Sequence, residues 1–151
     1  NELSDEDLMQ IVYERSLIKA FIVSKYEKEK GDRALLNFGH TYGHAFEAIQ
    51  SLEGFSHGQA VGLGMICASH LSFLLKKISS EEFERVKNLV KSAGLPHKLP
   101  ENFDVNDFIE AMSRDKKILD KKLRFITLRG LGSAEITEDP PEDLVLKSIN
   151  L

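Results

Sequence analysis

The sequence predicts a mainly helical fold with one minor β-hairpin. Apolar residues recur at three- and four-residue intervals over most of the 151 residues, which is the spacing of amphipathic helices. Only the stretch 123–128 alternates between apolar and polar residues as a strand does. The regular alternation of strands and helices that builds a parallel sheet is missing, and a single pair of short strands does not form a sheet-based domain.

The first helix is expected from Ser4 to about Ser24. Ser4 followed by Asp7 resembles a capping box, which marks a helix start. A charge-rich segment from Tyr26 to Gly31 follows and is interpreted as a connector. The apolar residues with helical spacing in the first helix are Leu8, Ile11, Val12, Leu17, Ile18, Phe21 and Ile22.

Two further helices are expected in the middle of the chain. One begins at Leu36 and ends at the pair Glu53–Gly54, because glycine interrupts helices. The next, from Gly58 to about Lys76, is apolar nearly all round, which is typical of a buried central helix. Gly62 and Gly64 in this helix permit close contacts with a neighbouring helix.

The second half of the chain adds two helices and the hairpin. Ser79 with Glu82 begins an amphipathic helix that ends before Gly94. Asp104 caps a short helix that leads to the run DKK at 115–117. The hairpin joins the strand 123–128 to residues 134–136 through a turn at Gly130 and Gly132, and the pair Pro140–Pro141 opens a last helix that ends near Ile149. No linker is evident, so residues 1–151 are expected to form one domain.

The composition is that of an ordinary soluble globular protein, with 42% hydrophobic and 29% charged residues. The net charge of -4 offers no basic surface for nucleic acid or an anionic membrane, so neither partner is expected. The longest apolar stretch, 60–75, is too short and too interrupted to span a membrane. Cys67 is the single cysteine, is interpreted as a small buried apolar residue, and favours a cytoplasmic location.

The polar residues Asn37, His40, His44 and Glu47 recur at three- and four-residue intervals. If the segment is helical, they form one polar stripe that lines a cavity, and the glycines at 39 and 43 let another element approach the backbone. His57 opens the next helix, so three of the five histidines lie within eighteen residues.

The histidine cluster indicates a zinc site, because neutral imidazoles are common zinc ligands. The alternative is that the histidines are hydrogen-bonded structural groups, since an HxxxH pair alone is a weak metal signal. A catalytic zinc site needs a third protein ligand and an open position. On spacing alone, Glu47 is the local candidate for that third ligand.

The runs LNFGHTYGHAFE at 36–47, FSHGQAVGLGM at 55–65 and DKK at 115–117 resemble the C-terminal domain of 3-dehydroquinate synthase, an enzyme family of the shikimate pathway. The resemblance covers nearly the whole chain. It includes the residues that precede the histidine segment, namely Lys19, the acidic pair Glu27 and Glu29, and Arg33. Two positions depart from the family pattern: Tyr26 stands where an aspartate is usual, and Gln59 where a glutamate is usual.

The resemblance implies a role for each matching residue. It makes His40 and His57 the zinc ligands and places the third ligand, a glutamate, just before Asn1, which replaces Glu47 as the candidate. It makes His44 and Lys19 the catalytic residues. The implied ligands of the substrate phosphate are Asn37, His44 and Lys116, with Lys117 as the second choice to Lys116. The implied ligands of the substrate carboxylate are Lys19 and Arg33, supported by Glu29. Arginine offers a planar fork for a carboxylate, while lysine and imidazolium act as movable charges.

The resemblance also implies an activity. The enzyme would be a lyase that converts 3-deoxy-D-arabino-heptulosonate 7-phosphate to 3-dehydroquinate and phosphate in chorismate and aromatic amino acid biosynthesis. Its cofactors would be NAD and zinc, or cobalt in place of zinc. These residues contain no glycine-rich nucleotide motif after a strand, so an N-terminal NAD-binding α/β domain is expected upstream. The full-length enzyme is expected to be a homodimer, and the isolated chain is expected to be inactive.

Two alternatives remain open. The chain could come from a related sugar-phosphate cyclase or from a zinc- or iron-dependent glycerol or alcohol dehydrogenase. It could also be a non-catalytic helical module that binds metal or phosphate. The pair Lys19 and Arg33 favours dehydroquinate synthase over a dehydrogenase, because a neutral alcohol substrate has no carboxylate for them to bind.

Overall fold

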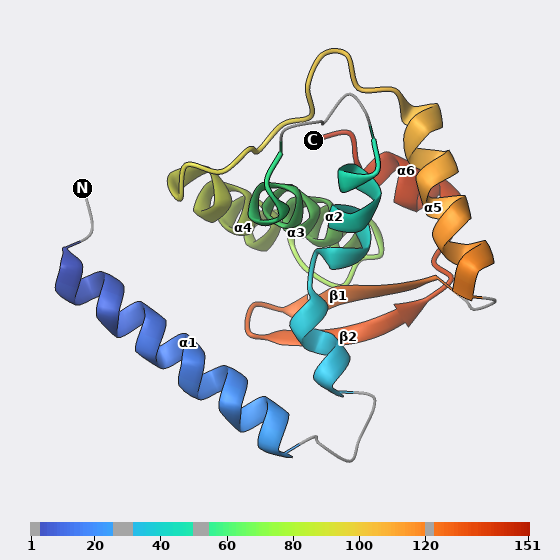
Figure 1. Cartoon of the computed structure of the whole chain (residues 1–151). Coiled ribbons are helices and arrows are strands. Elements are labelled where there is room, and N and C mark those ends of the chain that lie inside the picture. Colours follow the sequence, from blue (N-terminus) through green and yellow to red (C-terminus); the bar gives the residue numbers. More distant parts are fainter. Residues whose placement is uncertain (1–3, 26–31, 50–54, 120–122) are drawn as a thin grey trace. The chain divides into compact units, whose positions relative to one another are not determined.

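The computed structural model describes residues 4–25, 32–49, 55–119 and 123–151, and for residues 25, 32 and 115–119 it describes the backbone only. The chain separates into two compact units, Asn1–Leu36 and Asn37–Leu151, which are treated individually below. Within the described ranges there are six α-helices, one 3-10 helix and one two-stranded antiparallel sheet (Figure 1). The prediction of a mainly helical fold with a minor hairpin is therefore confirmed.

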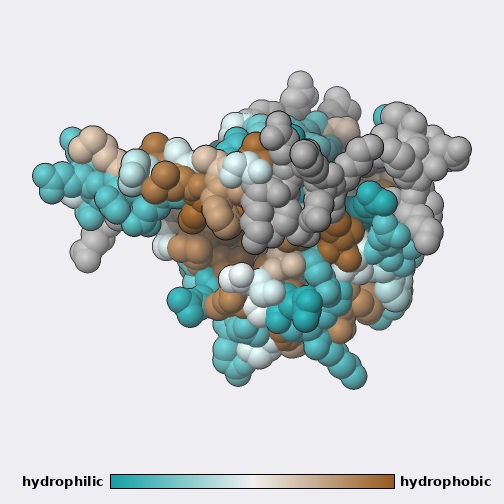
Figure 2. Space-filling model, turned by 90° about the horizontal axis from the view of Figure 1, so that it is seen from below, coloured by the Kyte–Doolittle hydropathy of each residue, from teal (hydrophilic) through white to brown (hydrophobic). Residues whose placement is uncertain are grey.

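The first unit contains helix α1, Asp5–Lys25, and most of the 3-10 helix η1, Asp32–Asn37. The expected capping box is present: the Ser4 amide donates to Asp7 Oδ2 at 3.1 Å, and the Asp7 amide donates to Ser4 Oγ at 3.1 Å. The Ser4 hydroxyl, at 2.6 Å, and the Ser4 amide both donate to the Asp7 carboxylate, and these two hydrogen bonds lower the pKa of Asp7. Figure 2 shows hydrophobic residues, in brown, on the surface of the protein. The large side chains of α1 that are exposed are Leu8, Met9, Ile11, Val12, Tyr13, Leu17, Ile18 and Phe21.

The second unit is built around one buried helix, α3. This helix contacts α2, α4, α6 and strand β1 (Figure 1), and Leu63, Ile66 and Leu71 on it are completely buried. Its burial on all sides confirms the prediction of a central apolar helix. The elements of the second unit are α2 His40–Glu47, α3 His57–Leu74, α4 Ser80–Ser92, α5 Val105–Leu119, β1 Arg124–Gly130, β2 Ser133–Glu138 and α6 Glu142–Ser148.

The histidine helix differs from the sequence prediction. A continuous helix from Leu36 to Glu53 was expected, but η1 ends at Asn37 and α2 begins only at His40. Between them Gly39 adopts the left-handed conformation, with φ of 82°, which interrupts a right-handed helix. Helix α2 also ends early, at Glu47. Asn37 therefore does not lie one turn before His40 on the same helix.

Helices α2 and α3 approach each other closely because both carry glycine at the crossing. A Cβ atom placed on Gly64 would lie 2.2 Å from the carbonyl oxygen of Gly39 and 2.9 Å from the amide nitrogen of Gly43. A Cβ atom on Gly62 would lie 3.0 Å from Leu95 Cδ1. The expected contact with a neighbouring helix is confirmed at Gly64, whereas Gly62 meets Leu95 in the segment after α4; the element that approaches Gly39 and Gly43 is α3.

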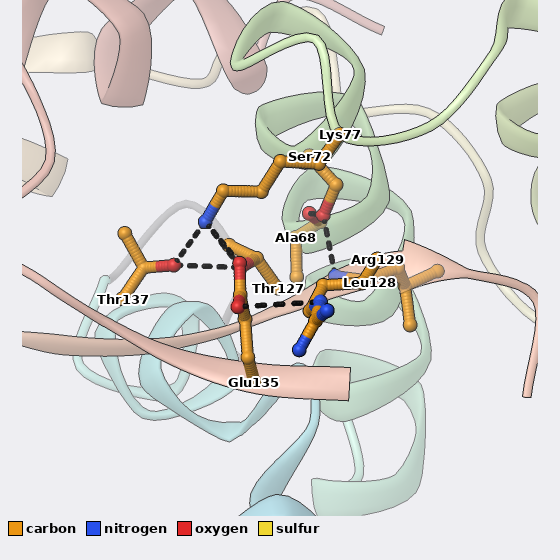
Figure 3. Close-up of polar contacts among 8 residues, drawn as sticks. All are labelled: Ala68, Ser72, Lys77, Thr127, Leu128, Arg129, Glu135 and Thr137. Carbon is orange, nitrogen blue, oxygen red and sulfur yellow. Dashed lines mark hydrogen bonds and ion pairs between the residues drawn. The ribbon is translucent and has the colours of Figure 1, made fainter. Parts of the chain in front are cut away.

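The hairpin is attached to the C-terminal part of α3 by polar side chains (Figure 3). Ser72 Oγ accepts a hydrogen bond from the Leu128 amide at 2.9 Å and donates one to the Ala68 carbonyl at 2.6 Å. The Nζ atom of Lys77 donates to Thr137 Oγ1 at 2.6 Å and forms an ion pair with Glu135 at 2.8 Å. A hydrogen-bonded polar network of this kind fixes one position of the sheet against the helix.

Except for the length of α5, the other elements agree with the sequence prediction. Helix α4 begins with the expected capping box, in which the Glu82 amide donates to Ser79 Oγ at 3.2 Å. Cys67 is completely buried, and burial raises the pKa of its thiol. Helix α5 continues to Leu119 and so includes the run 115–117, which was expected after a shorter helix. In the described part of the chain, none of the helices is both long and apolar enough to cross a membrane.

The glycine crossing yields a stability prediction. Gly64→Ala should lower the free energy of unfolding by about 3 kcal/mol, because the new methyl group overlaps backbone atoms that cannot rotate away. Gly58→Ala on the same helix is the matched control, since a Cβ atom there meets nothing within 4 Å. The control should be neutral or stabilising by up to about 1 kcal/mol. Urea unfolding of the three proteins measures both effects, and equal stabilities would contradict the prediction.

Candidate metal and substrate site

Three histidine rings meet where α2 and α3 begin. The distance between ring centroids is 5.5 Å for His40 and His57, 5.8 Å for His40 and His44, and 6.2 Å for His44 and His57. His40 is the first residue of α2, His44 lies one turn later, and His57 is the first residue of α3. The structure therefore brings together the three histidines that the sequence singled out.

Local structure determines where each ring lies. The glycine contact between α2 and α3 fixes the crossing that places His40 beside His57. The start of α3 is fixed by a capping box, in which the Gln59 amide donates to Ser56 Oγ at 3.3 Å and Gln59 Oε1 accepts from the Ser56 amide at 2.8 Å. Gln59, one of the two departures from the family pattern, thus serves as a helix-capping residue, since glutamine suits this position as glutamate does.

Two of the three histidines have an oxygen acceptor at Nδ1. His57 Nδ1 lies 3.0 Å from Glu47 Oε1, and His40 Nδ1 lies 3.4 Å from the Phe38 carbonyl oxygen. Carboxylate and carbonyl oxygens can only accept, so each Nδ1 must donate. The Nε2 atom of a neutral His40 or His57 then carries the lone pair that a metal ion requires.

The geometry of His40 and His57 suits a shared zinc or cobalt ion. Imidazole nitrogens bind zinc at about 2 Å, so two imidazoles on one tetrahedral ion have ring centroids about 5 Å apart. The His40–His57 separation of 5.5 Å is the nearest to this value among the three pairs. The spacing of these two imidazole donors is therefore compatible with one shared ion, and among the described residues no group of three or more histidine, cysteine, aspartate or glutamate side chains is arranged to hold one.

Solvent can reach the histidines. The side chain of His57 is 58% exposed and that of Glu47 33% exposed, while His44 is exposed and His40 half-buried. A small ligand can therefore contact these rings. The exposure of the His44 ring distinguishes it from His70. The His70 ring is half-buried, its Nδ1 lies 3.0 Å from the Ser148 carbonyl oxygen, and it stacks on Phe83.

His70 has a structural role. Burial lowers the pKa of its ring, which favours the neutral form. Its ring centroid lies 4.9 Å from that of Phe83. His70 therefore belongs to the packing between α3, α4 and α6 and is not part of the histidine cluster.

The remaining predicted site residues are only partly placed. Asn37 is exposed at the end of η1. Lys19 and Arg33 are exposed in the first unit, on α1 and η1. Glu29 lies outside the described residues, and Lys116 and Lys117 belong to the end of α5, where only the backbone is described. Within the second unit, the structure thus brings together the three histidines.

Two contacts were missed by sequence reasoning. Glu47 was a candidate third metal ligand on spacing, but its carboxylate contacts Nδ1 of His57. The Phe38 carbonyl contacts His40 from the turn before α2. Spacing within one helix identifies same-face neighbours only, so the sequence held no signal for a contact between Glu47 and the next helix.

Comparisons with known proteins identify the family. Residues 1–118 match the family model described as 3-dehydroquinate synthase C-terminal. The chain is 38% identical over 149 residues to 3-dehydroquinate synthase of Vibrio atlanticus, covering 99% of this chain and 41% of that protein. It is 42% identical over 146 residues to the enzyme of Acinetobacter baumannii, covering 96% and 40%. The chain spans about two fifths of the length of these curated relatives.

Solved structures show the same fold. A 2-deoxy-scyllo-inosose synthase complexed with carbaglucose-6-phosphate, NAD+ and Co2+ matches with a TM-score of 0.67 and 27% identity, over 83% of this chain and 36% of that one. A 2-epi-5-epi-valiolone synthase from Streptomyces hygroscopicus with NAD+ and Zn2+ bound matches with a TM-score of 0.80 over 97% of this chain and 40% of that one. At 20% identity the second likeness concerns the fold alone. Together with the family match over residues 1–118, these findings show that the chain belongs to the 3-dehydroquinate synthase family, where it corresponds to the C-terminal domain.

Proposed function

We propose that this chain is the metal- and substrate-binding part of an enzyme that converts 3-deoxy-D-arabino-heptulosonate 7-phosphate to 3-dehydroquinate and phosphate. The observation that carries the proposal is the convergence of His40, His44 and His57, two of which have an acceptor at Nδ1, so that their neutral rings carry the lone pair on Nε2. The family match and the relatives named 3-dehydroquinate synthase support the choice of reaction.

His40 and His57 would hold the metal ion, zinc or cobalt, and a glutamate from a segment preceding Asn1 would complete the site. When bound, the metal supplies Lewis acidity that lowers the cost of removing a proton from a substrate hydroxyl, and NAD held by a preceding domain supplies redox capacity. The two Nε2 atoms serve this role because their lone pairs are not used in hydrogen bonds to Glu47 or Phe38.

The residues around the metal would recognise the two anionic ends of the substrate. His44 is exposed beside His40 and His57, so its ring is available to a phosphate and can give a proton to it as it leaves. Asn37 and Lys116, or Lys117, would bind the same phosphate. Lys19 and Arg33, with Glu29 in support, would bind the carboxylate, because a guanidinium donates two parallel hydrogen bonds to a carboxylate.

The biological setting follows from the proposed reaction. The product belongs to the shikimate pathway, which leads to chorismate and the aromatic amino acids. We propose a cytoplasmic location and a homodimer for the intact enzyme, in keeping with the family resemblance. The chain is also 27% identical to a 2-deoxy-scyllo-inosose synthase. Another sugar-phosphate cyclase activity is therefore the alternative that the substrate assay must distinguish from dehydroquinate synthesis.

The proposed reaction is tested by activity. The intact enzyme, which includes the preceding domain, should release phosphate from 3-deoxy-D-arabino-heptulosonate 7-phosphate in the presence of NAD and zinc. The 151-residue chain alone should show no turnover and only weak zinc binding, because a two-histidine site lacks its third ligand. The assay measures phosphate and 3-dehydroquinate. Turnover by the chain alone, or preference of the intact enzyme for glucose 6-phosphate, would contradict the proposal.

The two histidines of α2 are predicted to have different roles. In the intact enzyme, His40→Ala should remove bound zinc, whereas His44→Ala should retain zinc and lower the rate of phosphate release by about 100-fold or more, the usual contribution of a general acid. Metal content measured by atomic emission, together with kcat, separates the two roles. If His44→Ala loses zinc as completely as His40→Ala, then the two histidines act as a simple ligand pair.

Arg33 is predicted to bind the carboxylate of the substrate. Arg33→Lys keeps the charge but loses the planar fork, so substrate binding should weaken by about 1.5 to 3 kcal/mol, the scale of a hydrogen bond to a charged group. Titrations with one analogue that has the carboxylate and one that lacks it measure this loss. Arg15→Lys, which alters another exposed arginine of the first unit, should change neither affinity. An equal loss for both analogues would show that Arg33 does not contact the carboxylate.

A further inference from the structure

The contact between Glu47 and His57 joins the end of one helix to the start of the next. Glu47 is the last residue of α2, and His57 is the first residue of α3. The Glu47 Oε1 atom lies 3.0 Å from His57 Nδ1. We propose that Glu47 is a positioning residue that holds His57 in the tautomer and orientation needed for metal binding, an inference that rests on the proposed metal site.

The first step of the argument concerns the proton on the ring. A carboxylate only accepts hydrogen bonds, so the contact requires hydrogen on Nδ1 of His57. A neutral ring then has its lone pair on Nε2. Without an acceptor at Nδ1, a neutral imidazole in water prefers to carry hydrogen on Nε2, which is the nitrogen that must be free. Glu47 therefore selects the tautomer that can bind metal.

The second step concerns ring orientation. The side chain of His57 is 58% exposed, so close packing does not hold its ring in one rotamer. The neighbouring rings of His40 and His44 lie at centroid distances of 5.5 and 6.2 Å, which restrict the ring only loosely. Among the residues that the structure describes, Glu47 forms the hydrogen bond that defines the direction of the ring, as outer partners do for metal-binding histidines.

The third step concerns the place of Glu47 in its helix. Carboxylates are disfavoured at the C-terminal end of a helix, where the partial charge of the helix dipole is negative. Glu47 occupies that end of α2, so local helix stability does not explain it. Its interaction with His57 does explain it.

Glu47 is not placed as a ligand of the same ion. The two nitrogens of an imidazole point to different sides of the ring, so an oxygen bonded to Nδ1 lies away from an ion bound at Nε2. In this arrangement Glu47 acts through His57. The sequence spacing that made Glu47 a candidate third ligand is thus better explained by a supporting role.

The experiment compares Glu47→Ala and Glu47→Gln in the intact enzyme, with Glu101→Gln, another exposed carboxylate, as the control. Zinc affinity is measured by competition with a chromogenic chelator. In the zinc-free proteins, nitrogen-15 NMR of labelled histidine identifies which nitrogen of His57 carries hydrogen, with His57→Ala used to assign the signal. Thermal melting verifies that each variant is folded.

Glu47→Ala should lower zinc affinity by about 10- to 100-fold, the usual effect of removing an outer partner, and should move the His57 hydrogen to Nε2. Glu47→Gln retains an acceptor oxygen, so it should keep hydrogen on Nδ1 and lose less than about tenfold in affinity. The control should match the wild type in both measurements. If Glu47→Ala does not fold, Glu47→Met, which also lacks an oxygen acceptor, replaces it with the same expected results, and the His57 tautomer of the wild type still tests the inference.

Results that contradict the role of Glu47 can be distinguished from results that contradict the metal site itself. Hydrogen on Nε2 of His57 in the wild type, or a Glu47→Ala variant unchanged in tautomer and zinc affinity, would overturn the inference and leave the proposed function standing. Loss of zinc in both variants with hydrogen still on Nδ1 would make Glu47 a ligand itself and would also overturn it. An intact wild-type enzyme that binds no zinc would refute the proposed metal site, and the inference with it.

Discussion

The close contact of α2 with α3 at Gly39 and Gly64 is the constraint on which the site depends. Gly39 needs its left-handed φ of 82° to end η1 and start α2. Gly64 must lack a side chain, because a Cβ atom there would lie 2.2 Å from the Gly39 carbonyl oxygen. His40 follows Gly39 directly, and α3 carries His57 at its start. A side chain at either glycine would separate the helices and would change the distance between the two imidazoles.

Helix α3 links this crossing to the rest of the second unit. The N-terminal end of α3 carries His57, and its middle contacts α2. The hairpin is held by Ser72 in the C-terminal part of α3 and by Lys77, which lies just after α3 in the chain. Functional groups are most precisely placed when they lie on rigid helices whose own contacts are fixed. The buried apolar surface of α3 therefore acts as a frame, although none of its buried side chains takes part in the proposed chemistry.

Local signals in the sequence predicted most of the elements, because the responsible interactions are between neighbours in the chain. The capping boxes at Ser4 and Ser79 are examples. The break at Gly39 was not predicted, since glycine there responds to a contact with α3 that is distant in sequence. The three histidines were identified by residue type, but the role of Glu47 depends on His57 in another helix, which spacing alone does not reveal.

A metal site built on the Nε2 lone pairs of two imidazoles needs further ligands. Two protein ligands hold zinc far less tightly than three or four, and a closed site needs a donor from elsewhere. If that donor belongs to a preceding domain, as proposed, then the metal binds well only when the two domains are together. Binding and association are then thermodynamically linked. The free energy by which domain association strengthens metal binding equals the free energy by which metal binding strengthens domain association. Preorganising His57 through Glu47 strengthens both effects, because it reduces the entropy lost when the ion binds.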